Sequence, residues 1–373
     1  MIDFGDQQVF RGATTYTAVH LFGKQRTPDG VDYAKVLDLQ DGQTQCGNLD
    51  AGRSAIGTVR FKARQPQGSK PWVFSNARVT KWLDAVRGDH PTLGEISAKI
   101  AQGLVTSADD VFYLRREGKR FRSEATQKLF ELEREVVHPI LKGSLHMKRW
   151  VPLDPDLFVL FPYEKVGSSW RLIPEKQWAT NYPLAWAYFK ENRKRLEGRE
   201  SSRLVGKPEW YGFIYPKNLE VMAKTKILVP AIAMSAQYCL DAGGDYHYVG
   251  SGGGHAIVPK IKIDLHYLCG LLNSTCLDAF LHWVTTPFHS GWFAYSKAYI
   301  AQIPIKLPTT AEDKKLAERI TDSVRTIMSA KVKLRGTSLS DRERISLEGD
   351  VESYERRIDE DVFRLYGVDG LPG

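Results

Sequence analysis

The histidines, acidic pairs and glycine-rich runs of this chain are the residues from which metal sites, nucleases and nucleotide-binding loops are built, each at fixed spacings. The nine histidines show neither His-x-x-x-His nor His-Glu-x-x-His spacing. Gly250-Ser-Gly-Gly-Gly254-His255 fails the Gly-x-Gly-x-x-Gly pattern at its last position, and no Walker lysine follows. A nuclease needs Glu-x-Lys after a distant Asp, whereas Glu131-Leu-Glu133-Arg134 ends on the wrong residue. We therefore expect neither catalytic residues nor a metal site in this chain.

Polar and basic side chains near the expected strand ends offer a different chemistry, the recognition of nucleic acid. Base edges are read by polar side chains on loops that a rigid sheet projects, while Lys and Arg hold the surrounding phosphates. For each candidate the alternative is ordinary surface polarity. Trp292-Phe-Ala-Tyr295 is a candidate aromatic shelf, with core packing as the alternative for at least two of its rings. The DNA-binding candidates are Thr106, Ser107, Lys148, Arg149, Arg171, Lys217, His247, Ser251, His255, Ser290 and Lys297.

The placement of charge favours a polyanionic partner for the middle of the chain. The formal net charge is +8, from 52 Lys and Arg against 44 Asp and Glu. Residues 51–87 carry eight basic residues against Asp84 alone, and 115–150 and 190–226 each carry ten against five. Residues 311–373 carry twelve against fourteen. A polyanion held by the central region through counterion release fits this pattern, and a solvated face is the alternative.

The composition is that of a globular protein of two or three units, with 42% hydrophobic and 26% charged residues. No apolar run approaches the ~18 residues that span a bilayer, and the N-terminus lacks the order of a secretory signal, so a cytoplasmic location is favoured. Cys46, Cys239, Cys269 and Cys276 have no Cys-x-x-Cys spacing, which predicts reduced, buried thiols rather than a zinc site.

The elements that must position the candidates follow from turn signals and periodicity. A hairpin is expected around Gly12, a strand over residues 33–37, a linker over 65–70 and an amphipathic helix over 79–86. Two antiparallel helices are expected in the tail. The first buries Leu316, Ile320, Val324, Ile327 and Met328; the second starts at the capping box Ser340-Asp-Arg-Glu343, buries Ile345, Val351, Tyr354, Ile358, Val362 and Leu365, and ends at Gly367.

Several blocks of this chain, in order, resemble the C-terminal portion of TaqI-like and type IIG (Eco57I-like) restriction-modification adenine methyltransferases. Val9 to Thr17 is similar to the last motif of their catalytic domain, and Leu93 to Leu114 to the opening of their target-recognition domain. The chain departs from the family pattern mainly at Gly143 to Lys148 and in the run from Gly250 to Gly254. Further blocks are Ile140 to Trp150, Phe158 to Tyr163, Tyr182 to Arg199, Glu209 to Tyr211, Lys226 to Ile232, Leu271 to Ser274, Tyr299 to Ile305, and Ile358 to Gly367.

The resemblance implies that this chain reads DNA while catalysis resides elsewhere. A methyltransferase of the family needs a glycine-rich loop for S-adenosylmethionine and an Asn-Pro-Pro-Tyr-type loop, and this chain contains no Pro-Pro pair. The cofactor is therefore expected for the parent enzyme and not in this chain. Phe10, or alternatively Tyr16, is the candidate for stacking on a flipped base.

The expected fold is α+β, with a remnant methyltransferase hairpin, a mixed-sheet target-recognition domain and a C-terminal helical hairpin. The expected divisions are 1–50, trailing methyltransferase strands; 51–90, a basic connector; 91–310, the target-recognition domain; and 311–373, the helical hairpin. The expected partners are double-stranded DNA and a methyltransferase region in cis or in trans. The alternatives are a protein-interaction module with a basic surface, a free-standing specificity subunit, and a complete hydrolase without familiar motifs.

Overall fold

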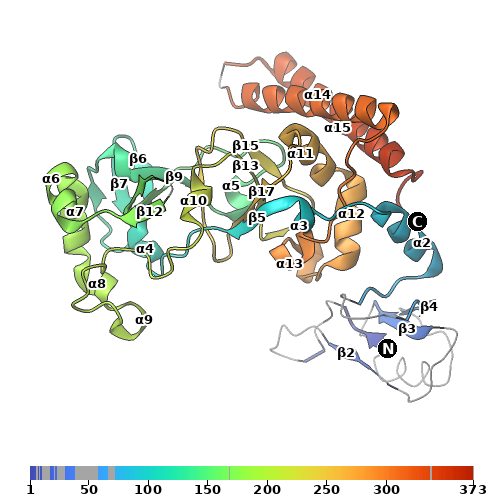
Figure 1. The fold of residues 1–373 in the computed structure, drawn as a ribbon, viewed down its shortest axis with the longest axis horizontal. Coiled ribbons are helices and arrows are strands. Elements are labelled where there is room, and N and C mark those ends of the chain that lie inside the picture. The colour runs from blue at the N-terminus through green and yellow to red at the C-terminus, as the bar shows by residue number, and fades with distance from the viewer. Residues whose placement is uncertain are drawn as a thin grey trace.

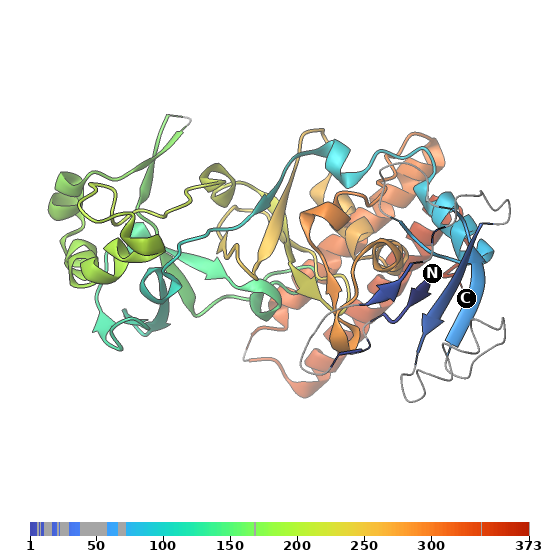
Figure 2. The same cartoon turned by 90° about the horizontal axis from the view of Figure 1, so that it is seen from below.

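The computed structural model describes residues 1–5, 7, 9–10, 17–20, 22, 30–37, 58–65, 72–167, 169–336 and 338–372. These residues form several sheets and many short helices, which confirms the predicted α+β class. Figure 1 shows an elongated molecule with two long helices along its upper side and the N-terminal strands below its right-hand end. Seen from below, in Figure 2, the long helices lie behind the sheets.

The N-terminal strands form a sheet in the order β2-β1-β3-β4. β1 runs antiparallel to β2 and parallel to β3, so the expected opening hairpin is present as the pair β1 and β2. The turn expected at Gly12 lies outside the described residues, as do Tyr16 and Cys46. Tyr33, Ala34 and Val36 are buried in the predicted strand. The bounds are β1 (Ile2–Asp3), β2 (Ala18–Val19), β3 (Val31–Val36) and β4 (Thr58–Ala63).

A second four-stranded sheet, in the order β15-β13-β17-β5, separates two hydrophobic cores in the middle of the molecule. The first core contains Phe112 and Trp178, and the second contains Leu271 and Phe280. Successive side chains of a strand point to opposite faces. In β13, Leu228 therefore enters the first core, whereas Ile227 and Val229 enter the second; in β17, Ala256 and Ile257 divide in the same way. The strands are β5 (Ser97–Gln102), β13 (Lys226–Pro230), β15 (Cys239–Asp241) and β17 (Gly254–Pro259).

The first core is built on a six-stranded sheet in the order β16-β9-β10-β6-β7-β8. Trp178 and Phe189, on two adjacent helices, meet edge to face with their ring centroids 5.2 Å apart, an orientation that aromatic pairs favour. The strands are β6 (Tyr113–Glu117), β7 (Arg120–Ser123), β8 (Leu129–Phe130), β9 (Val137–Leu141), β10 (Leu157–Leu160) and β16 (His247–Tyr248), and a separate hairpin joins β11 (Tyr163–Val166) to β12 (Ser169–Leu172). The helices are α4 (Asp109–Phe112), η1 (Arg134–Val136), α5 (Gly143–His146), α6 (Glu175–Asn181), α7 (Pro183–Glu191), α8 (Arg193–Glu197), α9 (Arg199–Ser202) and α10 (Leu219–Met222).

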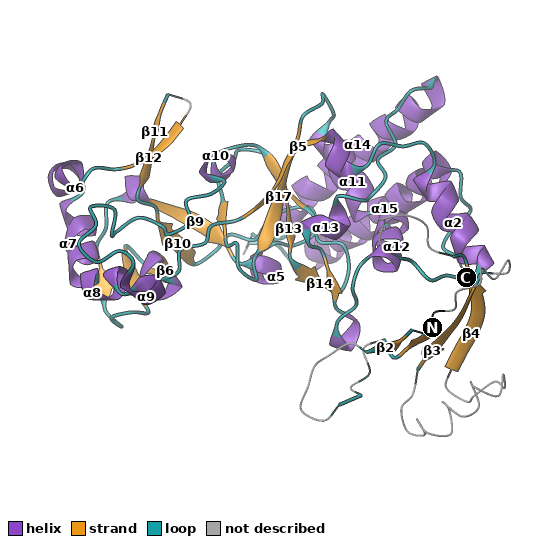
Figure 3. Ribbon diagram, turned by 60° about the horizontal axis from the view of Figure 1, so that its bottom comes forward, coloured by secondary structure: helices purple, strands orange, loops and turns teal. Residues whose placement is uncertain are grey.

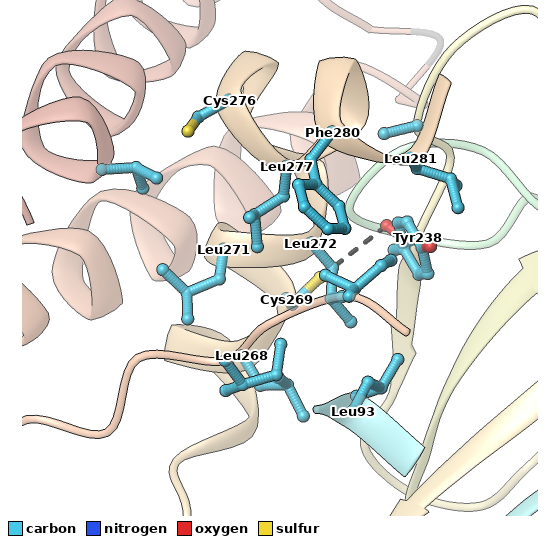
Figure 4. Packing of buried hydrophobic residues seen from close by; sticks show 14 of the residues in the cluster. Leu93, Tyr238, Leu268, Cys269, Leu271, Leu272, Cys276, Leu277, Phe280 and Leu281 are labelled. Carbon is cyan, nitrogen blue, oxygen red and sulfur yellow. Dashed lines mark hydrogen bonds between the residues drawn. The ribbon is translucent and has the colours of Figure 1, made fainter. Parts of the chain in front are cut away.

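The second core packs helices against the other face of the central sheet. Figure 4 shows Leu271, Leu277 and Phe280 meeting there, together with a hydrogen bond from the Cys269 thiol to the Tyr238 carbonyl. Burying a Leu or Phe side chain stabilises the fold by ~1.5–3 kcal/mol. The elements are α2 (Ala77–Arg87), α3 (Leu93–Ile96), β14 (Ile232–Ala233), α11 (Leu265–Asn273), α12 (Thr275–Val284), η2 (His289–Gly291), β18 (Phe293–Ala294), α13 (Lys297–Ile300), α14 (Ala311–Lys333) and α15 (Asp341–Tyr366).

The predicted amphipathic segment over residues 79–86 is the helix α2. Val79, Trp82, Leu83 and Val86 are buried in the second core. Part of the expected basic connector is therefore packed against the C-terminal helices, and the indole of Trp82 donates a hydrogen bond to the Gly370 carbonyl at 2.7 Å.

The predicted helical hairpin is confirmed by the contacts between α14 and α15. Ser340 accepts from the Glu343 amide at 3.3 Å and the Glu343 carboxylate accepts from the Ser340 amide at 2.9 Å, as the capping box predicts. Gly367 ends α15 at φ 66°. Ile345 is a correction, because it is 69% exposed rather than buried. Ile345 lies near the start of α15, ahead of Leu347, which packs against the second core.

Cys239, Cys269 and Cys276 are buried thiols without a disulfide, as expected. Among the helices of the described residues, none combines the length and the apolar character that crossing a membrane requires.

Candidate nucleic-acid interface

Three loops from distant parts of the sequence meet at the turn that follows β5. The Leu104 amide donates to the Tyr248 carbonyl at 2.8 Å, and the Gly250 amide donates back to the Leu104 carbonyl at 2.8 Å. Val105 forms an antiparallel bridge with Tyr215. The loops 103–110, 215–218 and 250–254 are thus fixed to one another. Figure 3 shows β5, which precedes the first of these loops, side by side with β17, which follows the last.

The glycines of the run from Gly250 to Gly254 are required by this close packing. A Cβ at Gly250 would lie 2.5 Å from the Gly103 carbonyl oxygen, and one at Gly253 would lie 2.0 Å from the Val249 carbonyl oxygen. Main-chain atoms occupy the space that a side chain would need. The same packing leaves Ser251 and Gly252 exposed at the tip of the loop.

Two predicted serines face one hollow beside these loops. Ser107 and Ser251 line a space of about 580 Å³ together with Asp109, Asp110 and Arg195. The backbone of Ser107 is held at φ 58°, a conformation that few residues other than glycine adopt. Neither serine hydroxyl hydrogen-bonds within the described residues. A hydroxyl both donates and accepts, so the pair can address the edge of any base.

His255 and Lys297 form a second predicted group on the neighbouring surface. His255 pairs through its backbone with Gln102 of β5, and Lys297 is the exposed first residue of α13. Burial, and then the nearby Lys297 ammonium, lower the pKa of His255, so its imidazole is neutral at pH 7. Its Nδ1 has no hydrogen-bond partner within the described parts of the chain.

Lys217 adds an exposed cation on the loop 215–218, with its ammonium 5.8 Å from the centre of the Tyr215 ring. Four of the eleven DNA-binding candidates therefore lie on elements joined through β5 and β17: Ser107, Lys217, Ser251 and His255. Lys297, on α13, lies near His255.

The remaining candidates lie apart from this group or have their side chains engaged inside the protein. Thr106 is buried, and its hydroxyl donates to Asp109 at 2.5 Å. Lys148 donates to the Ser144 carbonyl at 2.6 Å. Arg149 donates to the Asn273 carbonyl at 2.6 Å, pairs with Glu355 at 3.3 Å and lies over the Trp150 ring. These contacts assign the three side chains to internal support.

His247 is the candidate that differs most from the expectation of a surface residue. Its ring is buried, stacked on His138, and neither ring nitrogen has a hydrogen-bond partner among the described residues. His247 was expected near a strand end, but the packing of β16 beside β9 turns its ring inward. It therefore offers no atom to a surface ligand.

Arg171, Ser290 and Phe10 are exposed but stand on separate elements. Arg171 lies on β12, Ser290 in η2 at φ 61°, and Phe10, 57% exposed, follows the first strand of the N-terminal sheet. In the proposed aromatic shelf, Tyr295 is buried and Phe293 packs against the second core, which matches the alternative expected for two of the three rings.

Residues 193–207, here called the basic arm, carry a group of cations that were not among the DNA-binding candidates expected from the sequence. Lys194, Arg203 and Lys207 are exposed and have no ion-pair partner among the described residues. Figure 1 shows α8 and α9 of this arm projecting on the same side of the molecule as α13, opposite α14 and α15. The excess of ten basic over five acidic residues between 190 and 226 was the signal that pointed to it.

The chain matches no model of a protein family. It is 22% identical to the type II restriction enzyme and methyltransferase RM.Eco57I of Escherichia coli, over all of this chain and 38% of that protein. It is 21% identical to the type II methyltransferase M.BanIII of Aneurinibacillus aneurinilyticus, over 95% of this chain and 61% of that one. The chain is a distant homologue of type II restriction-modification methyltransferases. It spans less than two thirds of the length of these relatives.

The fold is also found in a solved structure. The type IIL restriction-modification enzyme MmeI, solved in complex with DNA, superimposes with a TM-score of 0.55 at 13% identity, covering 99% of this chain and 43% of that one. At this identity the likeness concerns the fold alone.

Proposed function

We propose that this chain is the part of a restriction-modification N6-adenine methyltransferase that recognises a specific sequence in double-stranded DNA. The observation that carries the proposal is the grouping of Ser107, Lys217 and Ser251 on three mutually fixed loops, with His255 on the adjoining strand and the exposed cations of the basic arm beside them. Polar groups on rigid loops read bases, and surrounding cations hold phosphates.

The comparisons support the same assignment. The relatives are type II methyltransferases, and MmeI was solved in complex with DNA. Because the chain spans only part of each, we place methyl transfer and the binding of S-adenosylmethionine in a catalytic region in cis or in trans. We assign residues 1–50 to the trailing strands of that region, 51–90 to a connector, 91–310 to target recognition and 311–373 to bracing.

Fluorescence anisotropy with duplex DNA of random sequence across a salt series tests the proposal. Each neutralised phosphate contributes ~0.9 to the slope of log affinity against log salt, so several contacts predict a slope of several units. A flat response, or no binding at low salt, would contradict it and favour an acidic protein as the partner. Nicking assays with and without Mg²⁺ address the alternative of a complete hydrolase.

A further inference from the structure

Two arginines one helical turn apart connect the basic arm to the loop that carries Ser107. Arg195 lies in α8 and Arg199 begins α9. Both side chains reach the segment 106–110, which is distant in the sequence. No other pair of side chains among the described residues of the arm makes this connection.

Arg199 is only 2% exposed and donates every one of its hydrogen bonds to the main chain. Its guanidinium reaches the carbonyls of Leu196 at 2.8 Å, Thr106 at 2.8 Å, Trp210 at 2.7 Å and Gly212 at 2.9 Å. The guanidinium also lies 5.4 Å from the centre of the Phe112 ring. One planar group with a fixed fork of donors thus fixes three separate segments, a geometry that a lysine ammonium does not reproduce.

Arg195 makes the second connection at the surface. Its Nε and Nη2 atoms donate to the two carboxylate oxygens of Asp110, both at 3.0 Å. Such a bidentate pair fixes direction as well as distance. Asp110 lies three residues beyond Ser107, and Arg195 lines the same hollow as Ser107 and Ser251.

The backbone between these two arginines and the rest of the arm is strained. Glu200, Ser201 and Ser202 have φ values of 46°, 59° and 65°, and Ser107 has 58°. Residues other than glycine keep such conformations only where the surrounding contacts fix them. The hydrogen bonds from Arg199 reach carbonyls on both sides of residues 200–202. Those from Arg199 to Thr106 and from Arg195 to Asp110 lie on either side of Ser107.

We propose that Arg195 and Arg199 are positioning residues for sequence discrimination, which hold the Ser107 loop at a fixed spacing from the phosphate-binding cations of the basic arm. This inference rests on the proposed function. When the basic arm binds the phosphate backbone of the DNA, the Ser107 loop then meets the base edges at one position and in one conformation. A mobile loop would keep the affinity for phosphates and lose the preference for one sequence.

The experiment uses the 373-residue chain. A duplex is first enriched from a randomised library by the wild-type chain, and its affinity is then compared with that of a scrambled duplex. Arg199→Lys and Arg195→Lys keep the charge but lose the fork. We expect each to lower the ratio of the two affinities by 10-fold or more, with unchanged affinity for the scrambled duplex and an unchanged salt slope. Arg193→Lys, whose ion pair with Glu197 lies within α8, should keep the wild-type ratio.

The outcomes separate this inference from the proposed function. If the wild-type chain prefers the enriched duplex and the variants keep the same ratio of affinities, the positioning role is wrong and the proposed function stands. A wild type that enriches no sequence overturns both. If Arg199→Lys does not fold, the exposed Arg195→Lys decides alone, because its pair with Asp110 lies at the surface.

Discussion

The imidazoles of His138 and His247 stack with their centroids 4.6 Å apart and their planes within 17° inside the first core. Burial lowers the pKa of both, and for His247 the neighbouring His138 and Lys226 lower it further. Since neither ring nitrogen of His247 is hydrogen-bonded within the described residues, its neutral form is the one that packs.

This pair predicts a loss of stability in acid. The unfolded histidine has a pKa of ~6.5, so below that pH the unfolded state binds the proton that folded His247 excludes, and stability falls as pH falls. Between pH 7.5 and 5.5 the loss from His247 is ~1.4 kcal/mol. Urea unfolding of wild type and His247→Phe at both pH values measures it. Equal losses in the two proteins would refute the assignment.

Gly349→Ala is expected to stabilise the protein. Gly349 lies inside α15, and a Cβ there meets no atom within 4 Å. Removing a helical glycine contributes ~0.5–1 kcal/mol. Gly270→Ala in α11 is the contrasting control, because its Cβ would lie 2.5 Å from a methyl carbon of Ile320. In thermal unfolding, the melting temperature of Gly349→Ala should lie above that of the wild type, and that of Gly270→Ala should lie below it.

Breaking the buried ion pair between Lys226 and Asp241 should be costly. The ammonium and carboxylate are 2.6 Å apart, with side chains 0% and 1% exposed, and Asp241 also accepts from the Asp245 amide. Lys226→Met leaves an unpaired buried carboxylate, at a cost of ~3–5 kcal/mol. Adding Asp241→Asn should restore part of that stability in denaturant titrations. A double variant no more stable than Lys226→Met would show that the charge is not the cause.

The cations of the basic arm should account for part of the salt dependence of DNA binding. Replacing Lys194, Arg203 and Lys207 with Gln is expected to reduce the log-log salt slope by ~2–3. A variant with Lys314, Lys315 and Lys333 of α14 replaced by Gln loses the same charge on the opposite side of the molecule. Equal reductions in both variants would mean that net charge, and not the arm, governs binding.

Phe10→Ala should slow methyl transfer in the enzyme that combines this chain with a catalytic region. The ring is 57% exposed and free to stack on an extruded base. Base stacking contributes ~1–3 kcal/mol, so single-turnover rates should fall ~5- to 150-fold. Phe22→Ala, at an even more exposed ring, is the control. An unchanged rate for Phe10→Ala would exclude this role.

The sequence predicted best what depends on local spacing. The buried stripe from Leu316 to Ile327, the capping box at Ser340 and the helical end at Gly367 involve residues within a few turns of each other, and the structure contains all three. The capping box that opens α14, from Thr310 to Asp313, has Asp in place of the usual Glu or Gln, so it departs from the sequence signature that marks Ser340.

Nonlocal packing explains what the sequence could not predict. Whether His247 is buried depends on the pairing of β16 with β9, about a hundred residues earlier in the chain. Arg199 is one of ten basic residues in its stretch, and only the folded chain brings the carbonyls of Thr106 and Gly212 to its guanidinium. Ile345 belongs to the apolar stripe of α15 but is exposed, because the sequence pattern does not show where the core beneath the helix ends.

The central sheet has a mechanical consequence. Because Leu228 fills one interior and its neighbours Ile227 and Val229 fill the other, a shift of β13 by one residue would empty both at once. If one core loses its packing against the central sheet, the other face of the same sheet loses its support and its core is exposed to water. Melting should accordingly proceed as one concerted event across residues 72–372, whichever half is damaged first.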